Sequence, residues 1–474
     1  MLVGTGSDVG KSVLATALCR IFLQDGYHPA PFKAQNMALN SYATPDGFEI
    51  GRAQAVQAEA CGIPCSTDMN PILLKPNSDH TTQVVLNGKP IGNRSAYDYF
   101  RKEGREELRL QTHLAFDHLS VRYNPIVMEG AGSVSEINLR DTDLANMSMA
   151  RYANADVLLV ADIDRGGVFA SCYGSVMLQY PDDRKHIKGI IVNKFRGDIR
   201  LFGEGCKMLE DICGIPVLGV VPMFKNIYIE EEDSVALESK ASQFSLLSSK
   251  VNVAVVLLRH ISNFTDFDIL ERDERVNLFY TSNTKDIEAA DIIILPGTKS
   301  TLDDLYELRR NGVAQSIVRA HKEGKTIIGI CGGYQMLGQT VSDPDGVEGS
   351  IPRLPGLGLL SIDTVMTADK ATTQVEFEFN GAFCKGYEIH QGRSTTDKMI
   401  LQEGNCIGTY IHGFLDNPAV INFILKEKQK EQAVTMSIDE YKDKQYNLLA
   451  DHVRAHLDMT RLYKILTSTQ HNGN

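Results

Sequence analysis

The 474-residue sequence predicts an α/β protein with two doubly wound domains in tandem. Short apolar runs alternate with segments of helical period through residues 1–225, which is the pattern of βα units around a parallel sheet. A second series of apolar runs begins at residue 251, after an acidic and serine-rich stretch. With 43% hydrophobic and 23% charged residues, the chain can fill two sizeable cores.

The first domain is expected to span residues 1–228. Its apolar runs end near Gly, Asp or Asn, as buried parallel strands do before the next loop. Apolar side chains at residues 13–21 recur with helical spacing, so a helix should follow the first run. The predicted strands are Met1–Val3, Pro125–Met128, Val157–Ala161, Gly189–Val192 and Val217–Val221.

Residues 229–250 are expected to be a linker, because an acidic run and a serine-rich stretch offer few apolar anchors. The second domain is expected to span 251–450, followed by a C-terminal helix and polar tail over 451–474. Its predicted strands are Val251–Leu258, Asp291–Leu295, Thr326–Ile330 and Cys406–Ile411.

Composition excludes several classes of function. The net charge is −12, from 48 basic and 60 acidic residues, and no basic stripe is present, so nucleic acid is not an expected partner. No apolar run approaches the length of a membrane span, so no membrane partner is expected. The nine cysteines are dispersed without a CxxC pair, which favours reduced thiols and a cytoplasmic location.

The first chemical motif is a glycine-rich loop, Gly4–Ser12, that follows a predicted strand and opens a predicted helix. In that context, backbone N–H groups cradle phosphate, Lys11 reaches the outer phosphates and the Ser12 hydroxyl can bind Mg²⁺. Gly4 lies one residue further from Gly10 than the usual spacing. The alternative, a glycine-rich turn with an incidental Lys-Ser pair, fits this context less well.

Oxygen ligands for Mg²⁺ are also expected at the carboxyl ends of strands. Glu129 follows the run Pro125–Met128 and fits that position. Asp46 is a second candidate, although its spacing alone favours a plain turn aspartate. Asn193 ends another run, where an adenine contact and a strand-end cap are equally good interpretations.

The second chemical motif is Gly-x-Cys-x-Gly at Gly329–Gly333, where a predicted strand turns into a predicted helix. Small neighbours permit the strained turn that exposes a nucleophile, and the helix N-terminus, including Gly332, supplies N–H donors for an oxyanion. Cys331 is therefore interpreted as a nucleophile. The alternative is an ordinary buried core cysteine.

A thiol nucleophile needs a base, and two histidines compete for that role. His412 follows the strand predicted at Cys406–Ile411, and His390 is its competitor. Gly297, after a further predicted strand, could supply a second oxyanion N–H.

These motifs resemble known families. The amino half is similar to dethiobiotin-synthetase-like P-loop ligases, and the carboxyl half to the class I glutamine amidotransferase domain. The resemblance implies a P-loop NTPase-like parallel sheet followed by a flavodoxin-like domain. The fusion resembles the cobyric acid synthase family over nearly the whole chain. The segments that carry this last resemblance are Gln35–Tyr42, Asp46–Gln54, Asn70–Pro76 and Gly386–His390.

The resemblance implies a ligase that amidates carboxylates b, d, e and g of adenosylcobyrinic acid a,c-diamide. ATP, Mg²⁺, glutamine and a corrinoid carboxylate would be its cofactors and substrates. It assigns the nucleotide and its Mg²⁺ to Lys11 and Ser12. By the same resemblance, Lys33 faces the transferred phosphate, Asp46 and Glu129 lie on the metal side, Cys331 is the glutaminase nucleophile and His412 is its base.

Three questions stay open from the sequence. Class I amidotransferases usually have Glu two residues after the histidine, and Phe414 stands there, so the partner that orients His412 is not identified and Glu388 is a weak candidate. Cobyrinic acid a,c-diamide synthase and a partitioning-type switch ATPase are the rival interpretations. Whether the protein forms a homo-oligomer is not indicated.

Overall fold

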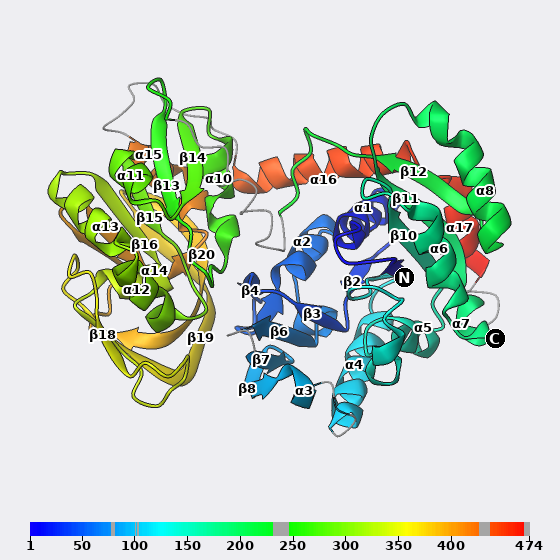
Figure 1. The fold of residues 1–474 in the computed structure, drawn as a ribbon, viewed down its shortest axis with the longest axis horizontal. Coiled ribbons are helices and arrows are strands. Elements are labelled where there is room, and N and C mark those ends of the chain that lie inside the picture. The colour runs from blue at the N-terminus through cyan, green and yellow to red at the C-terminus, as the bar shows by residue number, and fades with distance from the viewer. Residues whose placement is uncertain (77–80, 100, 102–103, 231–245, 426–436, 469–474) are drawn as a thin grey trace.

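The computed structural model describes residues 1–76, 81–99, 101, 104–230, 246–425 and 437–468. Figure 1 shows two α/β units side by side, with one long helix, α16 (Ile438–Arg454), running from the second unit across to the first. Residues 231–245 of the linker expected at 229–250, and residues 469–474 of the tail, lie outside the described residues. Among the described helices, none is long and apolar enough to span a bilayer.

The first unit is built on a parallel sheet, and each predicted apolar run overlaps one of its strands. A parallel bridge between Leu2 and Glu129 joins the pair β2–β9 to the row β1–β10–β11–β12. The sequence did not predict β2. In spatial order the strands are β2 (Ala30–Phe32), β9 (Ile126–Met128), β1 (Leu2–Gly4), β10 (Val157–Asp162), β11 (Ile187–Phe195) and β12 (Val217–Pro222).

Helices pack on both faces of this sheet. The first, α1, starts at Lys11 directly after the glycine-rich loop and buries Leu14, Ala17, Leu18 and Ile21, as its periodicity predicts. The other helices of this unit are α2 (Arg52–Ala60), α3 (Ala96–Tyr99), α4 (Arg105–Ser120), α5 (Met147–Tyr152), α6 (Val168–Met177), α7 (Pro181–Arg184), α8 (Gly203–Cys213) and α17 (Met459–Ser468).

A smaller group of strands lies between the parallel sheet and the second unit (Figure 1). The sequence did not predict these strands, because several are short and include polar residues such as Gln35, Asn36 and Ser41. They form the sheet β3 (Gln35–Met37), β6 (Ile72–Pro76), β7 (Thr81–Leu86) and β8 (Lys89–Ser95), and the hairpin β4 (Ser41–Ala43) with β5 (Glu49–Gly51).

The main sheet of the second unit is parallel except at one edge, where β21 runs antiparallel to β22. All four runs predicted in this unit contribute a strand, and β14 and β21 are added. The spatial order is β14 (Val276–Thr281), β13 (Val251–Val256), β15 (Ile292–Leu295), β16 (Thr326–Ile330), β22 (Cys406–Thr409) and β21 (Ile400–Glu403). The helices are α10 (Asp268–Arg272), α11 (Thr284–Ala289), α12 (Thr301–Arg310), α13 (Val313–Lys322), α14 (Gly332–Leu337) and α15 (Pro418–Leu425).

A mixed sheet completes this unit and changes one prediction. The single strand predicted at Cys406–Ile411 is two strands, because the chain leaves the main sheet after Thr409 and β23 (Ile411–His412) pairs with β20 instead. This transfer carries His412 into the second sheet. The remaining strands of that sheet are β18 (Arg353–Pro355), β17 (Thr340–Ser342), β19 (Asp363–Phe379) and β20 (Ala382–Ser394).

Most of α16 falls within the second domain expected at 251–450, but the helix packs on the first unit. Its residues Tyr446, Leu449 and Val453 share an apolar core with Leu14 and Leu18 of α1, so the helix packs on the first unit. The sequence could not assign the helix to that unit, because an amphipathic pattern predicts that one face is buried but not which surface it packs against.

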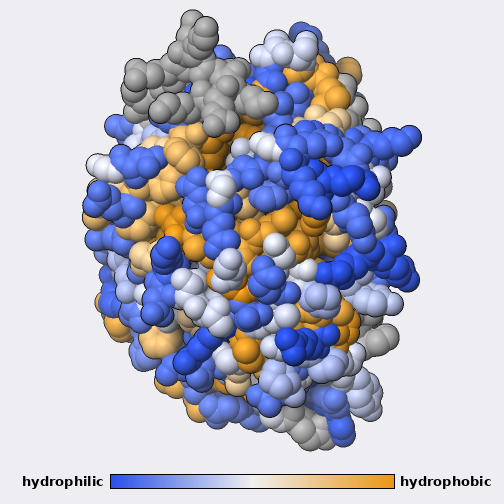
Figure 2. Space-filling view, turned by 90° about the vertical axis from the view of Figure 1, so that its left-hand side faces the viewer, coloured by the Kyte–Doolittle hydropathy of each residue, from blue (hydrophilic) through white to orange (hydrophobic). Residues whose placement is uncertain are grey.

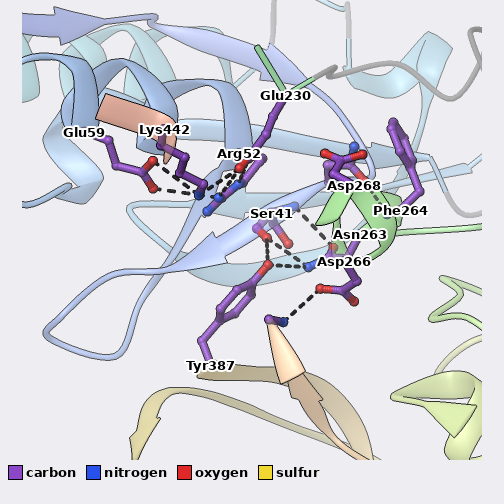
Figure 3. Close-up of polar contacts among 12 residues, drawn as sticks. Ser41, Arg52, Glu59, Glu230, Asn263, Phe264, Asp266, Asp268, Tyr387 and Lys442 are labelled. Atoms are coloured by element: carbon purple, nitrogen blue, oxygen red, sulfur yellow. Dashed lines mark hydrogen bonds and ion pairs between the residues drawn. The ribbon is translucent and has the colours of Figure 1, made fainter. Parts of the chain in front are cut away.

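The start of the expected linker is also anchored (Figure 3). Glu230 Oε1 accepts from Arg52 Nη2 at 2.9 Å and lies 2.8 Å from Lys442 Nζ on α16, and its Oε2 pairs with Arg52 Nε. The anchor combines this buried ion pair with apolar packing of the preceding Ile229 against the core of the first unit, neither of which is expected of a linker. The face of the second unit that points away from the first unit shows apolar patches separated by hydrophilic residues (Figure 2).

Candidate active sites

The glycine-rich loop has the conformation that its glycines permit. Gly10 has φ of +94°, and a Cβ there would lie 2.2 Å from Asn193 Nδ2, so only glycine fits. Asn193 donates to the carbonyl of Val9 at 2.9 Å. Asn193 therefore braces the loop through Nδ2, as a strand-end cap would, and the adenine contact considered for it stays a prediction.

A cavity of about 740 Å³ opens beside this loop. Lys11, Ser12, Lys33 and Glu129 all line it, so the structure brings four of the predicted residues together. Glu129 follows β9, at the carboxyl end of the parallel sheet, where ligands of open α/β sheets bind.

Glu129 is the centre of a buried hydrogen-bond cluster in that cavity. Its Oε1 accepts from the Ser12 hydroxyl and pairs with Lys33 Nζ, both at 2.8 Å. Its Oε2 accepts from Gln57 Nε2, also at 2.8 Å. Sequence reasoning missed Gln57, because a glutamine on α2 has no motif that distinguishes it from a surface polar residue.

The cluster keeps Glu129 ionised. Burial alone would raise the pKa of this carboxyl, but the Lys33 ammonium and the hydrogen bonds from Gln57 and Ser12 lower it below its usual value. Lys11 Nζ donates to the carbonyls of Gly6 and Gly132, at 3.1 and 2.8 Å. A charged carboxylate and two lysines thus face one cavity.

Asp46 lies elsewhere. It sits in the turn between β4 and β5, where its carboxylate accepts a hydrogen bond from the Thr44 hydroxyl at 2.5 Å. Asp46 is not one of the described residues that line the loop cavity. The structure therefore does not bring it together with Ser12 and Glu129 and agrees with the plain turn aspartate that its spacing favours.

Cys331 has the strained geometry of a nucleophile elbow. It connects β16 to α14 with φ of +52°, which is uncommon for a residue other than glycine. A Cβ on Gly333 would lie 1.9 Å from the Leu295 carbonyl, and one on Gly329 would lie 2.4 Å from the Leu337 side chain. The flanking glycines are required by this close packing, as the motif predicts.

His412 is paired with a carboxylate that the sequence did not identify. Asp266 Oδ2 lies 2.7 Å from His412 Nδ1, and Asp266 Oδ1 accepts from the N–H of Gly413 at 2.9 Å. Asp266 belongs to the 3₁₀ turn Phe264–Phe267, 146 residues before the histidine. Phe414 is fully buried in the core.

This pairing controls the protonation of His412. Burial lowers the pKa of the imidazole, but the Asp266 carboxylate and the adjacent Cys331 side chain outweigh that effect and raise it to about 10. His412 can therefore hold the proton that the thiol gives up. His412 is 1% exposed and Cys331 is 7% exposed, so bulk water has little access to either.

The cavity at Cys331 has a volume of only about 30 Å³. Residues from both units line it, including Cys331, Gly332 and His412 from the second unit and Lys75 from β6 of the first. His390 also lines it, with its ring stacked on Tyr410 and Nδ1 near the Gly392 carbonyl.

Gly297 lies directly before the cavity-lining residue Thr298, and its carbonyl accepts from the N–H of Ser262 at 3.0 Å. A Cβ on Gly297 would approach His412 Cε1 to 3.4 Å, so the glycine packs beside the imidazole.

Two family models match the two units. The first unit matches the CobQ/CobB/MinD/ParA nucleotide binding domain over residues 1–235. The second unit matches the CobB/CobQ-like glutamine amidotransferase domain over residues 252–420. Together the two matches account for a nucleotide-binding unit and a glutamine-hydrolysing unit in one chain.

Full-length relatives match as well. A protein named cobyric acid synthase from Bacteroides fragilis is 66% identical, and another from Phocaeicola vulgatus is 65% identical. Each alignment covers 98% of this chain and 98% of the relative. Among solved structures, one described as a glutamine amidotransferase is 17% identical, with a TM-score of 0.30, and covers 37% of this chain and 97% of its own.

Proposed function

The chain belongs to the cobyric acid synthase family, and we propose how its residues divide the reaction of that family between two sites. The reaction is an ATP- and glutamine-dependent amidation in cobalamin biosynthesis. We propose that the acceptors are carboxylates b, d, e and g of adenosylcobyrinic acid a,c-diamide and that the enzyme works in the cytoplasm. The observation that carries the division is the separation of the Ser12–Lys33–Glu129 cluster from the Cys331–His412–Asp266 set.

In the loop cavity, Ser12 and Glu129 would hold Mg²⁺. Both are hard oxygen donors on a site already prepared by Lys33 and Gln57, which is the donor chemistry that Mg²⁺ prefers. No group of three or more His, Cys, Asp or Glu side chains is placed for a metal among the described residues, so phosphate oxygens and water would complete the shell. Asp46 is not included in this proposal.

ATP supplies the phosphoryl group that makes an acceptor carboxylate an acyl phosphate, and Mg²⁺ screens the charge on that group. The chain provides the rest of the electrostatics. Lys11 and Lys33 would face the transferred phosphoryl group, because their ammonium groups line the same cavity as Glu129. Loop N–H groups at the start of α1 would hold the remaining phosphates.

At the second site, Cys331 would attack the side-chain amide of glutamine. His412 would accept the thiol proton and deliver it to the departing ammonia, leaving a glutamyl thioester on Cys331. Asp266 would hold the imidazole in the tautomer and orientation that this transfer requires. Water then hydrolyses the thioester, and the N–H of Gly332 would contribute to the oxyanion site.

Ammonia must travel from the second site to the first. Lys75 lines the Cys331 cavity from β6, and β6 pairs with β3, whose Gln35 and Asn36 line the loop cavity. The two cavities are thus neighbours across one small sheet. We propose that ammonia crosses at this sheet, sheltered from protonation in bulk water.

Mass spectrometry of cobyrinic acid a,c-diamide, incubated with enzyme, Mg-ATP and glutamine, tests the proposal. Stepwise conversion of four carboxylates to amides is expected. If the substrate lacking the a and c amides is converted instead, the activity is that of the rival a,c-diamide synthase. If neither corrinoid changes, the proposed acceptor is wrong.

A further inference from the structure

A buried set of hydrogen bonds joins the two units next to Asp266, the partner of His412 (Figure 3). Asn263 Nδ2 donates to the carbonyl of Ser41 at 3.0 Å and to the Tyr387 hydroxyl at 3.1 Å. The N–H of Ser41 in turn donates to Asn263 Oδ1 at 3.3 Å. One amide side chain of the second unit therefore pairs with both backbone groups of a residue in the first unit.

Asn263 also fixes the turn that carries Asp266. Its carbonyl accepts from the N–H of Asp266 at 3.0 Å, and it precedes the 3₁₀ turn directly. Its φ is +51°, a left-handed conformation that asparagine tolerates better than most residues. The position of the Asp266 carboxylate thus depends on how Asn263 is held.

Three further contacts support Asp266 and His412. The N–H of Phe264 donates to Asn40 Oδ1 at 3.3 Å, so the first unit also holds the start of the turn. The Tyr387 ring stacks on the His412 imidazole, with centroids 5.4 Å apart and planes at 26°. The ring of Tyr42 packs on Tyr387 at 4.5 Å. Residues 40–42 of the first unit therefore contact the supports of both Asp266 and His412.

We propose that Asn263, Ser41 and Tyr387 form an interdomain latch that positions Asp266 and His412 for glutamine hydrolysis. The proposal rests on the glutaminase role given above to Cys331 and His412. Ser41 lies four residues beyond Met37, the last residue of β3, and Gln35, Asn36 and Met37 all line the phosphate-loop cavity. One segment thus forms a wall of the ligase site and a support of the glutaminase site.

The variant Asn263→Asp in the full-length chain tests the latch. Aspartate keeps the shape and tolerates the left-handed backbone, but it cannot donate to Ser41 or Tyr387. Because misplacing a reacting group by about 1 Å can cost about 10²-fold, glutaminase kcat should fall about 10- to 100-fold. Asn263 also lines the Cys331 cavity, so the KM for glutamine should rise, but by a smaller factor than kcat falls. Ammonia-dependent amidation should be unchanged.

Asn405→Asp is the matched control. Asn405 Nδ2 also makes two hydrogen bonds, but both go to backbone carbonyls of its own unit, those of His321 and Lys325, at 3.0 and 2.5 Å. It has no contact with the latch. Equal thermal destabilisation of both variants, with loss of glutaminase kcat in Asn263→Asp alone, separates positioning from general stability. Equal glutaminase loss in both variants would overturn the proposal.

Two smaller changes keep the test decisive if Asn263→Asp does not fold. Asn40→Ala, in the first unit, removes the acceptor for the Phe264 N–H. Tyr387→Phe removes the hydroxyl that accepts from Asn263 and donates to the Ser41 carbonyl. Each should lower glutaminase kcat about three- to tenfold. Each should also alter the pH profile of kcat/KM through His412. Wild-type kcat and pH profiles in both would refute the latch.

The outcome for the proposed function is read separately. If wild-type enzyme does not amidate the corrinoid when either glutamine or ammonia is supplied, the proposed function fails. If wild-type enzyme is active and the latch variants are indistinguishable from it, only the latch fails.

Discussion

The phosphate-loop site and the thiol site differ in how they are assembled. Lys11 and Ser12 are neighbours at the start of α1, and Lys33 and Glu129 join them from the ends of β2 and β9 around a cavity of about 740 Å³. The thiol site gathers Asp266, Cys331 and His412 from distant parts of the chain around a cavity of about 30 Å³. A ligase site must admit a bulky substrate, whereas a glutaminase site must exclude water from its thioester until hydrolysis is due.

The small thiol site depends on residues of the first unit as well as on those of its own unit. The thiol cavity receives Lys75 from the first unit, and Lys75 Nζ lies 2.7 Å from Glu49 and 2.9 Å from the Ser41 hydroxyl. Glu49 also pairs with Lys370 of the second unit. Buried charges of both units thus close the glutaminase site, and changes on either side of the interface should reach it.

The largest expected effect separates the two sites. Cys331→Ala removes the proposed nucleophile, so glutamine-dependent amidation should fall by about 10⁴-fold or more. Amidation with added ammonium should stay within about threefold of wild type, because the loop cavity is unchanged. Product mass spectrometry with each nitrogen donor measures both rates. Loss of both activities would contradict the division of labour.

The next effect reverses that pattern. Glu129→Gln removes the charge shared by Ser12 and Lys33, so amidation with either donor should fall about 10²- to 10³-fold. Glutaminase activity without ATP should change little. Asp46→Asn is the matched carboxylate-to-amide control and should lower amidation less than about threefold, because Asp46 lies outside the cavity lining. A large loss of amidation in Asp46→Asn would contradict this expectation and indicate that Asp46 takes part in the metal site.

A smaller effect concerns the orientation of His412. Asp266→Asn removes the carboxylate that raises the pKa of the imidazole, so that pKa should fall and glutaminase kcat should drop about 10²-fold. The pH profile of glutaminase kcat/KM measures the shift. An unchanged profile would mean that Asp266 does not control His412.

The smallest effect is on stability. Because folding raises the pKa of His412 to about 10, charged His412 contributes stability that is fully present below its unfolded pKa, about 6.5, and is lost as the pH rises toward 10. The free energy of unfolding of wild type should therefore exceed that of Asp266→Asn most near pH 6, and this difference should shrink by pH 10. Denaturant unfolding at several pH values measures that difference, and a constant difference would contradict the assignment.

The predictability of the two sites follows the same contrast. The loop, its lysine and the cysteine elbow are local motifs in which backbone conformation dictates residue type, so the sequence reveals them. Asp266 and Gln57 act through tertiary packing, and nothing in their neighbours in sequence marks them. The same reason explains why α16 was expected in the second unit and why the strand before His412 was predicted as one piece.

The most direct test of the account is the origin of the nitrogen in the product. Wild-type enzyme would be given Mg-ATP, the corrinoid, glutamine carrying a heavy nitrogen isotope in its side-chain amide, and excess unlabelled ammonium. If the two sites are connected across the β3–β6 sheet, the new amides should carry mostly the heavy isotope by mass spectrometry. Amides with the isotopic composition of the bulk ammonium would contradict a sheltered transfer between the sites.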